Sequence, residues 1–262
     1  MTASDPISRI GRFFAWSAAV LVLGPLPVLL AVSTSPNWQR GPWVGGFTLR
    51  WLIEAWERIA PIVSFSVQLA LIVLLIDFLI GLPASWVLAR RNFRGRQLLL
   101  NLTILPIAVP GIAVGLGLIL AYPTLKAGGW LLIVGHILYT LPFVIGSLTP
   151  TLADAKLREQ ETAAETLGAN SLQRLLFVTL PQLRRTLTAA AVMVFTLSMG
   201  EFNVSFFLFT PNQKPLPVEL YSGYITGRLE VAAAATVWFL LLVIPAAVLI
   251  ERLGGSRLRG QA

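Results

Sequence analysis

The sequence has 262 residues, of which 56% are hydrophobic and 12% charged, whereas a soluble domain carries about 25% charged residues. It contains no cysteine and one histidine, which excludes disulfide frameworks, thiol nucleophiles and multi-histidine metal sites within the chain. The net charge of +8 is scattered between long apolar runs, not gathered on one face among aromatic residues, so it does not indicate a nucleic-acid partner. These features predict an all-α polytopic membrane protein.

Six apolar runs are expected to be transmembrane helices, because each is close to the ~20 residues that a bilayer core requires. They are 12–33, 62–88, 98–120, 130–149, 187–209 and 231–251. Together they predict a single transmembrane domain over residues 1–262.

The basic residues predict how this domain is oriented. Alternation of the spans puts the N-terminus, 89–97, 150–186 and the C-terminal tail on one side, with 14 Lys and Arg residues against six on the other. Basic residues accumulate in cytoplasmic loops. Both termini and the loop 150–186 are therefore expected in the cytoplasm.

The first apolar run has some features of a secretory signal peptide, because Arg9 and Arg12 precede it and Ala31-Val32-Ser33 resembles a cleavage site. Its length of about 20 residues exceeds the usual 7–15 of a signal sequence. We interpret it as a retained helix that Gly24 and Pro25 kink.

Segment 34–61 is the longest loop predicted on the outer side. Its four tryptophans are typical of an interfacial aromatic belt, and the alternative is a docking surface for an external partner. They are Trp38, Trp43, Trp51 and Trp56.

The third apolar run contains Pro106 and Pro110, each of which removes a backbone donor. A kinked packing helix is the favoured interpretation, and a discontinuous segment that lines a transport route is the alternative.

Two carboxylates are expected at membrane depth, Asp77 midway along the second span and Glu201 midway along the fifth. Such groups cost at least ~2.5–3.5 kcal/mol on insertion scales, so they normally face a cavity or a partner. Nearby Asn203 and Ser205 favour a substrate-pathway role for Glu201. For Asp77, a pathway role and an interhelical contact are equally favoured, and His136 is expected to be an interhelical hydrogen-bonding residue.

Loop 150–186 has helical chemistry of its own. Helical spacing places four residues on one face, namely Gln160, Ala163, Ala164 and Leu167. Gly168 follows where a left-handed residue would end the helix, and Ser171 is positioned to cap a second short helix that stops near Leu180-Pro181. The pattern predicts a helix–turn–helix elbow that accepts a partner, or alternatively an amphipathic pair on the lipid headgroups.

The elbow segment, which reads QETAAETLGA over 160–169 and VTLP over 178–181, resembles the EAA loop of binding-protein-dependent ABC importer permeases. Further matches are Leu105-Pro106, Pro110-Gly111, the segment 201–207, and Leu216-Pro217-Val218 near Tyr221. Together these segments resemble permeases of the spermidine/putrescine type, and the resemblance implies the type I ABC importer permease fold.

The resemblance also implies which residues couple the permease to an ATPase. They are Glu161, Thr162, Ala163, Ala164, Leu167, Gly168, Leu180 and Pro181. Three positions depart from the family pattern, since Thr162 stands where the motif has glutamate, Arg185 where proline is common, and Gly200 where polyamine-type members often carry aspartate.

The implied protein is a non-enzymatic permease that moves its substrate across a bacterial inner membrane by alternating access. No GxxxxGK[ST] phosphate loop occurs in the chain. No cofactor is therefore expected here, and ATP and Mg²⁺ would bind the partners. The implied partners are a second permease subunit, two ATP-binding subunits, an extracytoplasmic solute-binding protein and membrane lipid.

A polyamine such as spermidine or putrescine is the expected substrate, because two carboxylates at depth suit a cation. Ferric iron, thiamine, phosphonate and sulfate remain alternatives. Two further classes stay open, an ion-gradient-driven secondary transporter that uses Asp77 and Glu201, and a membrane scaffold or signalling subunit.

Overall fold

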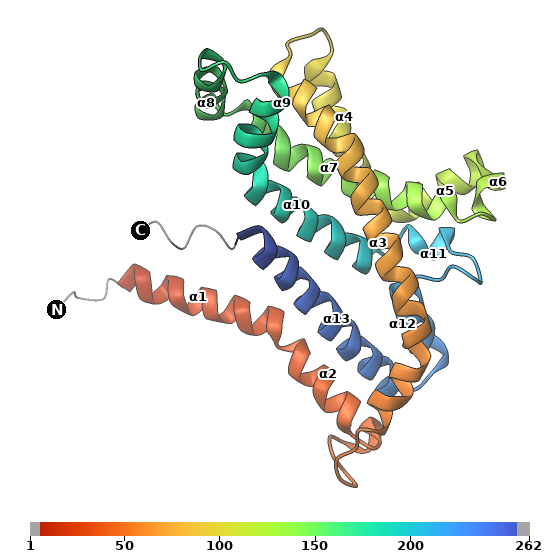
Figure 1. The fold of residues 1–262 in the computed structure, drawn as a ribbon. Helices are drawn as coiled ribbons and strands as arrows, with labels where there is room; N and C mark the ends of the chain where they lie inside the picture. The colour runs from red at the N-terminus through yellow and green to blue at the C-terminus, as the bar shows by residue number, and fades with distance from the viewer. Residues whose placement is uncertain (1–5, 256–262) are drawn as a thin grey trace. The chain divides into compact units, whose positions relative to one another are not determined.

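The computed structural model describes residues 6–255, in which helices are joined by turns and loops and no β-strand occurs (Figure 1). The all-α prediction is confirmed. The longer helices are α1 (Pro6–Leu23), α2 (Pro25–Thr34), α3 (Arg50–Arg90), α4 (Arg96–Ala108), α5 (Gly111–Ala121), α7 (Trp130–Ala153), α8 (Ala155–Thr166), α10 (Leu180–Gly200), α12 (Leu216–Thr226) and α13 (Leu229–Gly255). The short ones are η1 (Trp38–Arg40), α6 (Pro123–Lys126), α9 (Ser171–Arg174), the π-helical η2 (Leu175–Thr179) and α11 (Ser205–Leu208).

The chain divides into two compact units. The first contains residues up to 60 together with 220–241, and the second contains 61–219 together with residues from 242 onward. Helices α3, α12 and α13 contribute residues to both units. A single permease domain stays a prediction.

Within residues 6–255, four helical segments are long and apolar enough to cross a membrane, namely Ile10–Thr34, Arg50–Arg90, Trp130–Ala153 and Leu229–Arg252, and the bent pair α4–α5 is a fifth if it is counted as one span. The first is interrupted at Gly24, as expected, because Pro25 starts a new helix there. The second is longer than predicted. Helix α3 begins at Arg50, so the segment expected to be an outer loop is helical from residue 50 onward.

The third predicted span is a discontinuous segment, which corrects the expectation of a merely kinked helix. The chain bends by 101° between α4 and α5. Pro110 has no backbone N–H to continue α4, and Val109 before it has the extended conformation that a following proline favours (φ −86°, ψ 130°).

The fifth predicted span corresponds to α10, but its boundaries differ. The helix starts at Leu180 and ends at Gly200, so Glu201 follows the helix and does not lie midway along it. The signal that hydropathy missed is local, since the residues after Gly200 turn away into α11.

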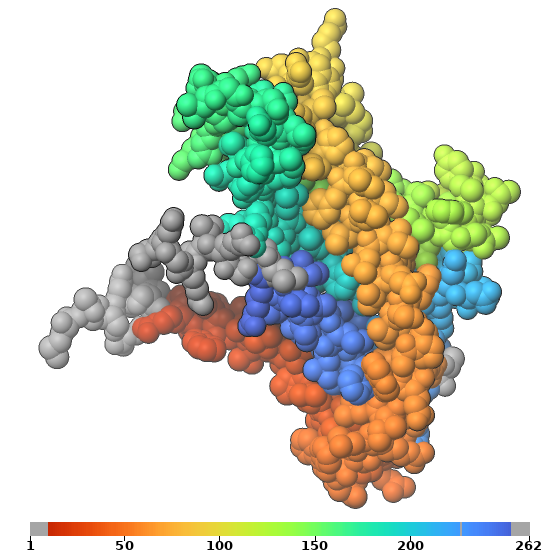
Figure 2. Space-filling view, in the orientation of Figure 1, coloured from red at the N-terminus to blue at the C-terminus, as the bar shows by residue number. Residues whose placement is uncertain are grey.

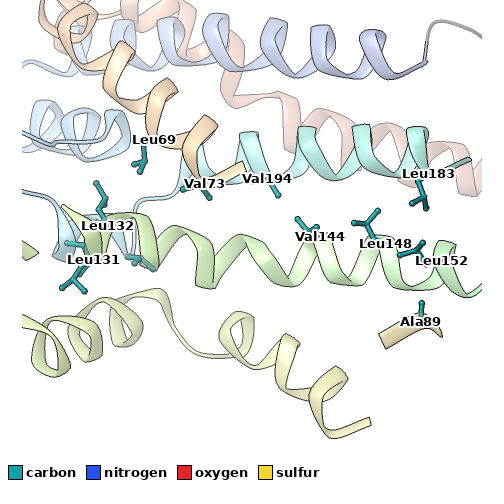
Figure 3. Packing of buried hydrophobic residues seen from close by; sticks show 12 residues of the cluster. Leu69, Val73, Ala89, Leu131, Leu132, Val144, Leu148, Leu152, Leu183 and Val194 are labelled. Carbon is teal, nitrogen blue, oxygen red and sulfur yellow. The ribbon is translucent and has the colours of Figure 1, made fainter. Parts of the chain in front are cut away.

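The core of the second unit is formed where α3, α7 and α10 pack together (Figure 3). Leu69 and Val73 from α3 lie near Val194 from α10, and Leu148 from α7 lies near Leu183. Lipid is as apolar as leucine, so in a membrane such contacts gain from close packing more than from the exclusion of water. The core therefore depends on shape at each helix crossing.

In the first unit, Trp51 is a packing residue and not part of an exposed aromatic belt. It is buried, and its indole N–H donates to the Ser35 carbonyl at 2.9 Å. The guanidinium groups of Arg50 and Arg228 lie 4.9 and 5.0 Å from its ring centroid. Contacts of this kind attract a cation to the ring face, so Trp51 joins α3 to the start of α13.

Gly135 sets the distance between α7 and α11. A β-carbon at this position would lie 2.6 Å from Val204 Cγ1 and 2.7 Å from Leu208 Cδ1. We expect Gly135→Ala to destabilise the protein by about 1–3 kcal/mol, the usual cost of overpacking, measured as the midpoint of thermal unfolding in detergent. Gly146→Ala on the same helix is the control, because nothing lies within 4 Å of its added carbon. Equal midpoints for the two variants would contradict this account of the crossing.

Candidate functional site

The first helix of the elbow is α8, and a left-handed residue at Gly168 ends it, as the sequence predicts. Asp154 caps the start of α8 by accepting a hydrogen bond from the Lys156 N–H at 2.9 Å. Gly168 has φ +90°, its N–H donates to the Glu165 carbonyl, and the Ala169 N–H donates to the Ala164 carbonyl, both at 2.9 Å. This pair of bonds is the Schellman motif, which requires a left-handed residue.

The second half of the elbow differs from the prediction in its cap and in its end. Asn170, not Ser171, caps α9, and it exchanges hydrogen bonds with Gln173 in a capping box. The helix does not stop at Leu180-Pro181. Its turns continue through η2 into α10, where Pro181 occupies the first turn, a place that needs no N–H donor.

The predicted docking face is open to a partner. Leu167 is 89% exposed, Ala163 and Thr162 are exposed, and Gln160 and Ala164 are half-buried. Figure 2 shows the α8–α9 region as a protrusion of the second unit. An exposed leucine beside small side chains lets another protein approach the backbone closely.

Glu161 faces inward and bonds to two residues from other elements. Its carboxylate forms a bidentate ion pair with Arg90, the last residue of α3, at 2.8 and 3.0 Å. The Thr179 hydroxyl donates to the same carboxylate at 2.6 Å. In the sequence, Arg90 was used only as one of the basic residues that predict the orientation in the membrane. No local pattern links Arg90 to Glu161, which lies 71 positions away.

A buried polar network connects α3, α7, α10 and α11. The Thr140 hydroxyl donates to Asp77 Oδ2 at 2.6 Å, which is the interhelical contact anticipated for Asp77. His136 forms hydrogen bonds with Ser198 through Nδ1 and with Ser205 through Nε2, each 2.8 Å long. His136 is thus an interhelical hydrogen-bonding residue, as predicted, while Thr140 and Ser198 were missed.

Glu201 is buried and caps the short helix α11. One carboxylate oxygen accepts the Val204 N–H at 2.9 Å, and the other accepts the Ser205 N–H at 2.8 Å. Of the residues predicted beside it, Ser205 is buried, whereas Asn203 is exposed. In this conformation the carboxylate stabilises the turn after α10, and its role in a substrate pathway stays a prediction.

The sequence matches the family described as the binding-protein-dependent transport system inner membrane component over residues 81–257. The chain belongs to this family. It is the permease subunit of a binding-protein-dependent ABC importer and a multi-pass inner-membrane protein, which favours the importer over the secondary transporter and the scaffold considered above. The matched residues include the elbow, the discontinuous α4–α5 segment and every residue of the polar network except Asp77.

Two relatives illustrate this binding-protein-dependent permease family. The spermidine/putrescine transport system permease protein PotC of Escherichia coli is 30% identical over 243 residues, which cover 90% of this chain and 92% of PotC. The putative 2-aminoethylphosphonate transport system permease protein PhnV of Salmonella typhimurium is 28% identical over 238 residues, which cover 87% of this chain and 88% of PhnV. Both are permease components and not enzymes.

The fold of the permease has a counterpart among solved structures. A chain from the crystal structure of a bacterial ABC transporter involved in the import of the acidic polysaccharide alginate aligns with a TM-score of 0.67 and 16% identity. The alignment covers 96% of this permease and 98% of that chain. The type I ABC importer permease fold is therefore confirmed.

The capping role of Glu201 is testable in the permease. In Glu201→Gln, the amide oxygen can accept one backbone N–H, but the amide NH₂ faces the other. We expect a loss of about 1–3 kcal/mol, the cost of an unsatisfied buried donor, seen as a lower thermal midpoint in detergent. Glu57→Gln, at an exposed position, should leave the midpoint unchanged. An unaltered midpoint for Glu201→Gln would show that the cap contributes nothing.

Proposed function

We propose that this permease is driven by two separate ATP-binding subunits, which dock on the elbow formed by α8 and α9. The observation that carries the proposal is the elbow itself, with Gly168 held at φ +90° and Leu167 exposed beside it. Binding and hydrolysis of ATP, with Mg²⁺, take place on those subunits. Their closure moves the elbow, and the pore opens alternately to each side of the membrane.

The pore requires a second permease subunit, because this chain supplies only one wall. A groove of about 770 Å³ runs along α10 and carries Thr188 and Thr196 among apolar residues, with Arg185 and Glu251 also lining it. We assign this groove and exposed Asn203 to the pathway wall. Asp77 and Glu201 then support this wall and do not contact the substrate directly. Both carboxylate oxygens of Glu201, and one of Asp77, are hydrogen-bonded within the chain.

The proposed substrate is a small solute with a primary aliphatic ammonium group. The names of both relatives point to such solutes, since putrescine, spermidine and 2-aminoethylphosphonate all carry that group. A polyamine is our first choice. An extracytoplasmic binding protein delivers the solute, and membrane lipid covers the outer face.

Reconstitution of the complete complex tests the function and the substrate class together. The measurement is the rate of ATP hydrolysis in proteoliposomes after addition of the binding protein, loaded in turn with putrescine, spermidine or 2-aminoethylphosphonate. Sulfate, thiamine and ferric iron are the comparison solutes. Stimulation by an amine supports the substrate class, whereas stimulation only by a comparison solute overturns it. Uptake driven by an ion gradient without ATP would overturn the whole mechanism.

The cytoplasmic placement of the elbow is tested by thiol labelling. The chain has no cysteine, so Asn170→Cys introduces the single reactive thiol at an exposed position of the elbow. It should react with an impermeant reagent in inside-out vesicles and not in intact cells. Gln39→Cys, exposed in η1 on the predicted outer side, should give the opposite result. Labelling of Asn170→Cys from outside would invert the topology.

Gly168 tests the elbow as the coupling element. A β-carbon there meets nothing within 4 Å, so the restriction is torsional and not steric. A left-handed L-residue costs roughly 1–2 kcal/mol, and more if β-branched. Gly168→Val should insert normally, yet retain the ATPase poorly on co-purification and lose uptake. Gly168→Asn is the control, because asparagine tolerates this conformation. Normal uptake by Gly168→Val would separate the elbow from coupling.

A further inference from the structure

We propose that Glu161, Arg90 and Thr179 form a positioning clamp, which transmits movement of the elbow to α3 and α10. The inference rests on the proposed docking of an ATPase at the elbow. It assigns to Glu161 a role within the permease in place of a contact with the ATPase. The clamp joins α8, where Glu161 lies, to the end of α3 and the end of η2.

The geometry of the clamp is that of a specific, partly desolvated ion pair. The side chains of Arg90 and Glu161 are 13% and 14% exposed, and Thr179 is fully buried. Two parallel guanidinium–carboxylate bonds fix the relative orientation as well as the distance of their partners. The Arg90 guanidinium also lies 5.2 Å from the Trp86 ring centroid, one turn earlier on α3. Removal of one partner would leave the other charge buried and unpaired.

The last turn of α3 is held by further contacts around the clamp. Arg158, one turn before Thr162 on α8, donates to the Ala89 carbonyl at 2.8 Å. Arg96, the first residue of α4, donates to the Leu88 carbonyl at 2.7 Å. Carbonyls in the last helical turn have no partner within the helix and favour cations. Arg158 therefore fastens the end of α3 to the elbow, and Arg96 fastens the same end to α4.

Thr179 brings α10 into the same cluster. It is the last residue of the π-helical turn η2, and its hydroxyl bonds to Glu161 at 2.6 Å and more weakly to the Arg174 carbonyl at 3.3 Å. Single π-helical turns inside α-helices occur frequently at functional sites. The turns from residue 171 to Gly200 are continuous. A displacement of α8 that moves Thr179 is thus passed along α10 toward the polar network.

The position of the carboxylate distinguishes a clamp from a docking contact. Thr162, at the family's glutamate position, is exposed, and its hydroxyl bonds to the Arg158 carbonyl of its own helix. The carboxylate stands one residue earlier and faces α3. Glu165, by contrast, is 59% exposed and pairs with Arg174 at the surface, where an ion pair contributes little.

The test uses the complete complex, with the permease carrying Asn203→Cys as a reporter beyond the end of α10. The rate at which a water-soluble thiol reagent labels this cysteine is measured with and without trapping by ATP and vanadate, which requires no knowledge of the substrate. Glu161→Gln and Arg90→Met should each reduce the trapping-induced change in rate about tenfold, within the usual range for coupling between sites. The ATPase should still co-purify and hydrolyse ATP.

The double variant and three further single variants complete the design. Glu161→Gln with Arg90→Met should be no worse than the more affected single variant, because both remove the same interaction. Arg90→Lys should restore part of the change, and Thr179→Val should lose part of it. Glu159→Gln removes the same charge from an exposed position of α8 and should behave as the native chain does.

Four outcomes overturn the clamp. They are an unchanged rate difference in Glu161→Gln, additive losses in the double variant, loss of the ATPase from Glu161→Gln but not from Arg90→Met, and an equal loss in Glu159→Gln. If Glu161→Gln fails to accumulate, Thr179→Val is the deciding variant. A trapping-induced change in labelling rate equal to that of the native chain would then overturn the proposal. If the native permease retains no ATPase, the proposed function fails instead.

Discussion

The structure depends on the requirement that polar groups at membrane depth find their hydrogen-bonding partners inside the protein, because lipid supplies none. His136 and Glu201 meet this requirement through two serines and two backbone N–H groups, and Asp77 meets it with one of its two oxygens, which accepts from Thr140. Each of these bonds joins separate elements or shapes the turn after α10. Small residues such as Gly135 then allow the helices to approach closely enough for the bonds to form. The buried hydrogen bonds thus depend on the close packing of the helices.

Features with a local cause were predictable from the sequence. Hydropathy located four of the six predicted spans as long apolar helices, because about 20 consecutive apolar residues are the length that crosses a bilayer core. Gly168 was predicted as a left-handed helix end and is one, because the Schellman motif is closed by bonds among neighbouring residues. The first helix breaks at Gly24 for a similar reason, since Pro25 acts on the residues next to it.

Other features were not predicted, either because hydropathy does not show where a helix ends or because the contact joins distant residues. Glu201 looked like a charge within a span, but the turn after Gly200 converts it into a cap. The prolines of the third span indicated a kink, and only the packed structure sets an angle of 101°. The ion pair between Arg90 and Glu161 connects residues 71 positions apart. A single sequence gives the charges of these two residues, but it does not show that the fold brings them together.

Helix α3 is longer than the hydrocarbon core of a membrane is thick. Its 41 residues rise by about 1.5 Å each, which gives a contour of about 60 Å, whereas a hydrocarbon core is about 30 Å thick. A tilt of about 60° would be needed to submerge the whole helix, beyond the observed range of about 0–40°. Part of α3 therefore lies outside the hydrocarbon core, and its N-terminal turns, which carry Glu54, Glu57 and Arg58, have the polar composition of such a segment. The helix that anchors the permease in the bilayer therefore also extends beyond the hydrocarbon core.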